Sequence, residues 1–121
     1  MANKIVKDSG LPIFVKQITV PQGTLANALV SLGAVAGLAN DLARLGDDGL
    51  YYVNVDTAAL IRVDAVAVAF TDKQPVWLTS ANAIAAATAS GSRIIGYADR
   101  PKSAPSGPLW VQLVPSAALT A

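Results

Sequence analysis

The last third of the chain alternates short apolar runs with turn residues, and this pattern constrains the fold more than any other feature. The runs cover residues 75–79, 93–98 and 109–114, and the segments between them are rich in Gly, Pro, Ser and Asp. Short runs with β-branched and aromatic residues are typical of strands, because helices show longer periodic segments. The pattern predicts an all-β fold, a small single-domain β-barrel or sandwich of short antiparallel strands.

Strand-like segments also fill the first two thirds of the chain, with one ambiguous stretch. Leucines in residues 38–45 have helical spacing, although Gly33 and Gly37 interrupt a long helix. We expect two short strands followed by a loop; the alternative is a short helix from an Asn40 cap to Leu45. The predicted strands cover residues 13–20, 28–32, 35–39, 50–55, 60–70, 76–79, 84–88, 93–98 and 109–114.

The longest predicted strand, residues 60–70, alternates between two faces. Ile61 and Val63 share one face with three alanines. The opposite face is predicted to carry Leu60, Arg62, Asp64, Val66, Val68 and Phe70.

The ends of the chain differ from its middle. Residues 1–12 hold charged and small residues around the apolar pair Ile5 and Val6, so we predict an extended N-terminal arm. Such an arm can add a strand to the sheet edge of a neighbouring molecule. The β-barrel or sandwich domain is predicted over residues 13–115 and a C-terminal tail over 116–121. The arm lacks the apolar segment of a signal peptide, which favours synthesis in a cytoplasm.

Residue types restrict the chemistry. The 121 residues include no His, Cys or Glu, so the usual general bases, thiol nucleophiles and soft metal ligands are absent. Nine Lys and Arg balance eight Asp without a basic run, which argues against nucleic-acid binding. Residues 91–96 resemble the start of a phosphate-binding loop, but Tyr97 stands where its lysine is required. We expect no enzyme, no cofactor and no metal site.

The apolar content indicates a binding surface. Hydrophobic residues make up 53% of the chain and charged residues 14%, more apolar material than one small core holds. We expect the surplus to meet another protein, either in a homo-oligomer or at a docking surface. Large apolar and amphipathic side chains are the candidate interface residues, although for at least two of Trp77, Tyr97 and Trp110 core packing with the polar tip at the rim is the favoured role. The candidates are Ile5, Val6, Phe14, Tyr52, Trp77, Tyr97 and Trp110.

Taken together, the segments from about Ile18 onward resemble the head decoration, or cement, proteins of tailed phages, of the DUF2190 type. The resemblance rests on the glycine-broken early strands around residues 32–39, on the turn and strand at 74–78, and on Arg-Ile-Ile-Gly-Tyr-Ala at 93–98. The closing strand Leu-Trp-Val-Gln-Leu at 109–113 completes it. The chain departs from the pattern by the Pro- and Ser-containing loop at 99–108 and by its longer arm.

The resemblance implies a structural virion protein without catalytic activity. It would bind the outer surface of the expanded capsid and cement neighbouring major capsid proteins, after synthesis in the host cytoplasm. Its partners would be the major capsid protein and further copies of itself, as a trimer in preference to a dimer, with no nucleic acid and no membrane. The alternative is a receptor- or glycan-binding surface module of a virion that uses loop 99–108 and an exposed aromatic residue.

Overall fold

The structure is a computed structural model that describes residues 3–11, 14–32, 35–87, 92–103 and 105–114. Within these residues the chain forms antiparallel strands and no α-helix, which confirms the predicted all-β fold. The strands are β1 (Lys4–Lys7), β2 (Val15–Val20), β3 (Leu29–Leu32), β4 (Val35–Leu38), β5 (Arg44–Leu45), β6 (Tyr51–Asp56), β7 (Leu60–Val66), β8 (Pro75–Leu78), β9 (Ile84–Ala85), β10 (Arg93–Ala98) and β11 (Gly107–Leu113).

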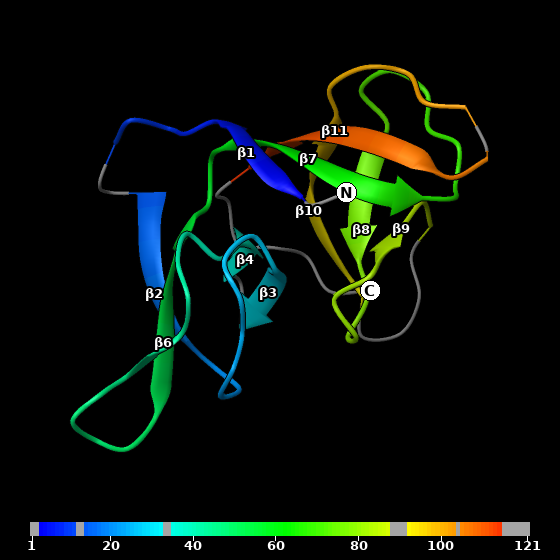
Figure 1. The fold of residues 1–121 in the computed structure, drawn as a ribbon. Helices are drawn as coiled ribbons and strands as arrows, with labels where there is room; N and C mark the ends of the chain where they lie inside the picture. The colour runs from blue at the N-terminus through cyan, green and yellow to red at the C-terminus, as the bar shows by residue number, and fades with distance from the viewer. Residues whose placement is uncertain (1–2, 12–13, 33–34, 88–91, 104, 115–121) are drawn as a thin grey trace.

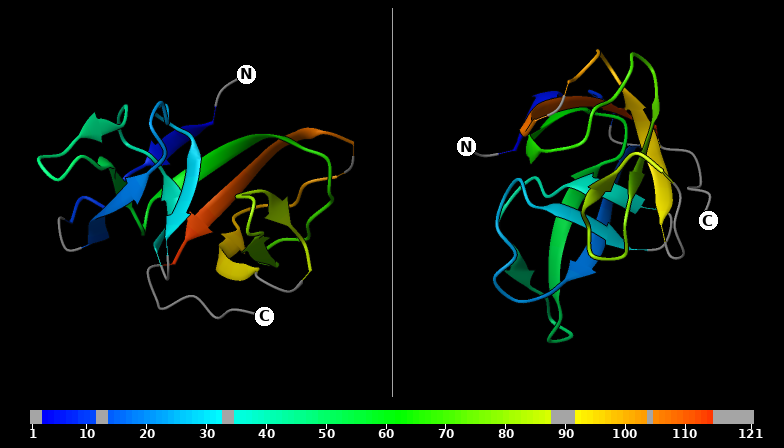
Figure 2. Two further views of the ribbon diagram at one scale, coloured as in Figure 1. Left: turned by 90° about the horizontal axis from the view of Figure 1, so that it is seen from below. Right: turned by 90° about the vertical axis from the view of Figure 1, so that its right-hand side faces the viewer.

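The strands form two lobes (Figures 1 and 2). The large lobe is a six-stranded sheet with the order β1-β7-β11-β10-β8-β9. The small lobe, residues 14–57, contains a three-stranded sheet with the order β2-β6-β5 and the pair β3-β4. The arrangement is sandwich-like and open, and it does not close into a barrel.

The main core lies between the six-stranded sheet and β4. On β8, Val76 and Leu78 are buried while Trp77 between them is half-buried, as expected when alternate residues point to opposite faces. β11 repeats this alternation. Ala36 and Leu38 of β4 add to the same cluster from the small lobe. Full burial of one such aliphatic side chain contributes about 1.5–3 kcal/mol, so this cluster is the main source of stability.

The small lobe has a core of its own that touches the main one. Gly37 of β4 makes this contact possible, because a Cβ there would lie 2.7 Å from Cγ1 of Val55 and 3.2 Å from Cδ1 of Leu113. The first distance is shorter than real Cβ contacts and the second is tighter than most of them, so a larger residue fits only if the neighbouring side chains shift. The buried residues of this second core are Ile18, Val30, Ala39, Val53 and Val55.

The described part of the predicted arm is bound to its own chain. β1 pairs antiparallel with β7, so the arm supplies an edge strand to its own sheet and not, in this structure, to that of a neighbour. The amide and hydroxyl of Ser9 then donate hydrogen bonds of 2.8 and 2.9 Å to Oδ2 of Asp56, a buried residue of the small lobe. The amide of Ala58 donates to Oδ1 at 3.0 Å. The arm therefore connects the two lobes.

The predicted strand over residues 60–70 is wrong in its second half. β7 ends at Val66, and Ala65 has a φ of 60°, in the left-handed region that breaks strand geometry. With a register shift against β11, this moves Val66 to the core side. Val66 and Phe70 are both buried, whereas strict alternation placed them on the face opposite Ile61.

Two other predicted segments also differ from the structure. Residues 40–45 do not form the alternative helix: Arg44–Leu45 is the strand β5, and the amide of Ala43 donates to the carbonyl of Thr24 at 2.9 Å. The predicted strand over 84–88 is shorter, since β9 ends at Ala85. Residue 88, residues 12–13 and the predicted tail at 116–121 lie outside the described residues.

Candidate protein-binding surfaces

One face of the six-stranded sheet points away from the main core, and we call it the outer face. Trp77, Tyr97 and Trp110 lie on it, because the residues before and after each of them in the strand are buried. The sheet order places their strands β8, β10 and β11 next to one another. All three side chains are half-buried. The structure thus brings together the three aromatic residues that the sequence marked in its last third.

Cations lie against the aromatic rings of the outer face. The guanidinium carbon of Arg100 is 4.0 Å from the centre of a Trp110 ring, and the ammonium of Lys73 is 5.7 Å from the centre of the Tyr97 ring. Cations within about 6 Å of a ring centre are attracted to its electron-rich face. The carboxylate of Asp99 lies 3.3 Å from Arg100 and 3.9 Å from Lys73, and so joins the two pairs.

Two further cations continue from Trp110 across the sheet. The ladder pairs Trp110 of β11 with Arg62 of β7, and Arg62 with Lys4 of β1. Residues paired directly across antiparallel strands point to the same face. We call Lys4, Arg62, Trp110 and Arg100 the cationic row. Two ion pairs moderate its charge, because Nε of Arg62 lies 3.2 Å from the carboxylate of Asp64 and the guanidinium of Arg100 lies 3.3 Å from that of Asp99.

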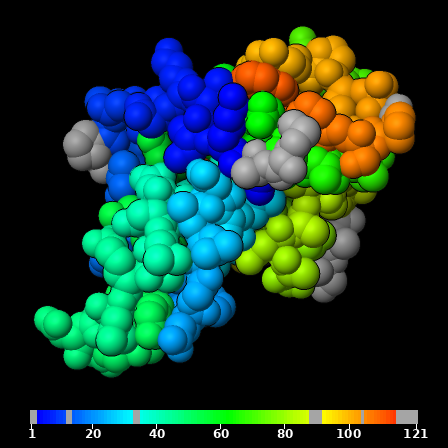
Figure 3. Space-filling model, viewed as in Figure 1, coloured from blue at the N-terminus to red at the C-terminus, as the bar shows by residue number. Residues whose placement is uncertain are grey.

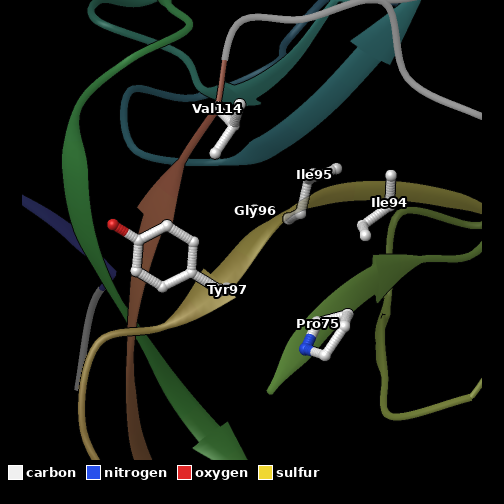
Figure 4. A pocket seen from close by; sticks show the side chains of 6 residues that line it. All are labelled: Pro75, Ile94, Ile95, Gly96, Tyr97 and Val114. Carbon is white, nitrogen blue, oxygen red and sulfur yellow. The ribbon is translucent and has the colours of Figure 1, made fainter. Parts of the chain in front are cut away.

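The outer face also carries an apolar hollow of about 250 Å³, bordered by Tyr97 (Figure 4). Figure 4 shows five side chains arranged around Gly96. Its lining is almost entirely apolar, and Val114 is 41% exposed at its border. The lining residues are Pro75, Ile94, Ile95, Gly96, Tyr97 and Val114. We call this group of residues the hollow.

Gly96 allows β10 and β11 to approach each other closely beside the hollow. A Cβ at Gly96 would clash with the carbonyl oxygen of Gln112 on β11, so no larger residue fits the close approach of the two strands. The register of β10 against β8 also shifts between Ile94 and Gly96, which marks a bulge. A bulge redirects the neighbouring side chains. Ile94 and Tyr97 therefore stand on either side of a position without a side chain.

The small lobe exposes aliphatic side chains at the turn between β5 and β6. Leu45 is 64% and Leu50 is 52% exposed, and they stand on either side of an Asp-Asp-Gly turn. We call residues 45–50 the leucine tip. Figure 3 shows it projecting from the rest of the molecule at the lower left. Single exposed leucines are common in proteins, but two at a projecting turn indicate a contact surface.

Hydrogen bonds give the leucine tip a defined shape. The amide of Gly46 donates to the carbonyl of Leu50 at 2.7 Å, and the amide of Leu50 donates to Oδ1 of Asp48 at 3.0 Å. The hydroxyl of Tyr52 donates to Oδ2 of the same carboxylate. The bonds from Tyr52 and then Leu50 hold the pKa of Asp48 below its usual range, and the bond to Asp48 raises the pKa of Tyr52.

The remaining predicted interface residues lie elsewhere. Ile5 packs against the main core, and Val6 is half-buried on β1. The carbonyl of Phe14 accepts hydrogen bonds of 2.9 Å from the amide and 2.7 Å from the hydroxyl of Thr57, which joins the two ends of the small lobe. Tyr52 contacts the leucine tip through the hydrogen bond from its hydroxyl to the carboxylate of Asp48. The seven predicted residues therefore do not form one surface.

Polar groups elsewhere in the described residues serve the fold. In the described ranges no group of three or more acidic side chains is placed to hold a metal ion. The loop at 99–108 is tied to the large lobe, because Lys102 and the buried Phe70 exchange backbone hydrogen bonds of 2.8 and 2.9 Å. The ammonium of Lys102 then donates to the carbonyls of Ser103 and Pro105. The described part of this loop is therefore braced against the large lobe at Lys102.

Comparisons with known proteins give no further guide. No family model matches the chain, and no curated protein or solved structure matches it. Within the described ranges there is no helical segment with the length and apolar character of a membrane span. A functional assignment therefore rests on the surfaces described above.

Proposed function

We propose that this protein is a structural virion protein that binds the outer surface of an expanded phage capsid and cements neighbouring major capsid proteins. The observation that carries the proposal is the cationic row, in which the Trp110 ring lies beneath Arg100 and next to Arg62. Trp and Arg are the residue types most enriched at the energetic centres of protein interfaces. The resemblance to head decoration proteins agrees with this use of the surface.

The cationic row defines the chemistry of the partner. It carries three cations and one large aromatic ring, so it fits a protein surface with carboxylates around an apolar patch. A cement needs only modest affinity at each contact. Many identical contacts on a closed shell add up, because each bound copy is one of many that resist the separation of the subunits. We propose the major capsid protein as this partner and the virion surface as the location.

We further propose that the protein is not an enzyme. Its sequence has no His, Cys or Glu, and its buried Asp56 is occupied by hydrogen bonds from Ser9 and Ala58. A general base must be within hydrogen-bond reach of a substrate proton, which a carboxylate committed to the fold does not provide. The aromatic and cationic surface is instead suited to binding without chemistry.

A receptor- or glycan-binding surface module is the second candidate function. The observation in its favour is the hollow, where the Tyr97 ring borders an apolar space on an exposed sheet face. Arg100 already lies over a Trp110 ring, so that face of the ring is not free to stack on a sugar. The cement proposal therefore takes precedence.

Co-sedimentation with undecorated expanded capsids tests the proposed function. The wild-type protein should bind saturably, at a fixed ratio to the capsid subunits, and should raise the temperature at which the particles rupture. Trp110→Ala should weaken binding about 30-fold, as expected for a hot-spot contribution of about 2 kcal/mol. Arg100→Ala should weaken it in the same direction and reduce its dependence on salt.

Two substitutions of exposed residues on the small lobe serve as controls. Lys16→Ala removes a cation and Leu25→Ala removes an apolar side chain, both away from the cationic row. Both variants should bind capsids like the wild type, and circular dichroism should report the same fold for all four variants. No binding to any capsid state would refute the proposal. Binding to glycans or host receptors, with particle stability unchanged, would favour the second candidate.

A further inference from the structure

The leucine tip is built as a contact element and has no partner within the described chain. Leu45 and Leu50 remain largely exposed, although the turn between them is fixed by hydrogen bonds through Gly46 and Asp48. An exposed element that is already ordered loses little conformational entropy when it binds. The tip is therefore prepared to insert its leucines into an apolar site.

The hollow has the size and chemistry for such an insertion. It measures about 250 Å³ and is lined by the apolar residues Pro75, Ile94 and Val114 among others. An apolar cavity of about 150 Å³ accommodates a benzene molecule, which has six carbon atoms. A leucine side chain has four, so the hollow can receive one leucine of the tip and part of a second.

The two features cannot meet within one molecule. The leucine tip is at the far end of the small lobe, whereas the hollow is on the outer face of the large lobe. In Figures 1 and 2 the turn between β5 and β6 lies at the free end of the small lobe, away from strands β8 and β10, which carry most of the lining of the hollow. A tip that fills a hollow must therefore come from a second molecule.

Charge also favours contact between unlike lobes. The small lobe, residues 14–57, contains two of the nine cations and four of the eight Asp residues, which gives a formal charge of −2. The rest of the chain contains the other seven cations and four Asp, which gives +3. Opposite charges steer two copies toward a small-lobe to large-lobe encounter, and like charges oppose contact between identical lobes.

We propose that copies of this protein associate head to tail, with the leucine tip of one copy seated in the hollow of the next. This contact goes beyond the proposed capsid binding and does not require a capsid. The hollow shares none of its lining residues with the cationic row. Because it joins two different surfaces, the contact is heterologous, so repeated association gives a ring if the rotation closes and a filament if it does not.

The mass of the isolated protein in solution tests this inference. Analytical ultracentrifugation of the wild type should show a concentration-dependent assembly larger than the 12.4 kDa chain. A tip variant, Leu45→Asn with Leu50→Asn, should be monomeric. A hollow variant, Pro75→Asn with Val114→Asn, should also be monomeric, and its exposed positions leave the core unchanged. The control Val68→Asn changes another exposed apolar residue and should assemble like the wild type.

Mixing the two variants distinguishes this contact from a symmetric one. The tip variant keeps an intact hollow and the hollow variant keeps an intact tip, so an equimolar mixture should form dimers and nothing larger. A symmetric interface between identical surfaces would give no such rescue. The inference is overturned by a wild type that stays monomeric at all concentrations, by a hollow variant with wild-type mass, or by a mixture that remains monomeric. Capsid co-sedimentation can succeed or fail independently of these results.

Discussion

The two lobes differ in how they use their apolar residues. Among the described residues, the main core of the large lobe holds fourteen buried residues, two of them supplied by β4, whereas the core of the small lobe holds five. The small lobe leaves leucines in solvent and fixes its projecting turn by hydrogen bonds instead. The difference indicates a division of roles, in which the large lobe supplies most of the stability and the small lobe presents a shaped surface.

Substitution of Gly96 should break the large lobe and has the largest expected effect. Gly96→Ala would drive a Cβ into the carbonyl oxygen of Gln112, so β10 and β11 must separate. We expect a loss of about 3 kcal/mol in the free energy of unfolding, measured by urea denaturation. Gly107→Ala is the matched control, because a Cβ there would lie 4.0 Å from the carbonyl oxygen of Pro105, its nearest neighbour outside the adjoining residues. Equal stability of the two variants would contradict the packing described here.

Substitution of Asp56 should loosen the connection between the lobes. Asp56→Asn replaces the carboxylate that accepts hydrogen bonds from Ser9, and a hydrogen bond to a charged group contributes about 1.5–3 kcal/mol. We expect a loss of about 2 kcal/mol and faster hydrogen exchange at the amides of β1. Asp8→Asn, a substitution of an exposed aspartate close to Ser9 in sequence, is the control. It should change neither the free energy of unfolding nor the exchange rates in β1. Unchanged exchange in β1 would show that the arm does not depend on Asp56.

The smallest effect is expected at the leucine tip and concerns pH. Tyr52→Phe removes the hydroxyl that lowers the pKa of Asp48, so this pKa should rise toward its usual value of about 3.9. A carboxylate with a lowered pKa in the folded state stabilises the tip above the unfolded pKa, and this contribution disappears as pH falls through the folded pKa. NMR titration of Asp48 should show the rise, and Tyr51→Phe should leave it unchanged. An unaltered titration of Asp48 in Tyr52→Phe would show that the Tyr52 hydroxyl does not lower the pKa of Asp48.

The sequence predicted the strands better than the surfaces. The local pattern of short apolar runs between turn residues was sufficient to predict strands β8, β10 and β11. The predicted range 93–98 coincides with β10. Alternation failed after Ala65, because a left-handed residue in a run of small apolar side chains gives no local signal. The Asp-Asp-Gly sequence at 47–49 is typical of an exposed turn, and the leucines on both sides of it were the available sign of the tip.

No local sequence signal predicted the hollow. It depends on a bulge and on the close approach of Gln112 to Gly96, two residues that are distant in sequence. The aromatic residues Trp77, Tyr97 and Trp110 could be named as interface candidates, but their position on one face follows from the strand order, which local patterns do not encode. The difference in formal charge between the small lobe and the rest of the chain is likewise apparent only once the structure shows which residues form each lobe.

The pairing of β1 with β7 has a consequence for the order of folding. The small lobe is a continuous segment placed between β1 and β7, whereas the large lobe needs β1, from the start of the chain, and β11, from its end. During synthesis the small lobe can form first, and β7 has to wait for its second neighbour until residues 107–113 emerge. Contacts of such long sequence separation make folding slow. Until the last strand arrives, the nascent chain exposes the apolar inner surface of an incomplete sheet.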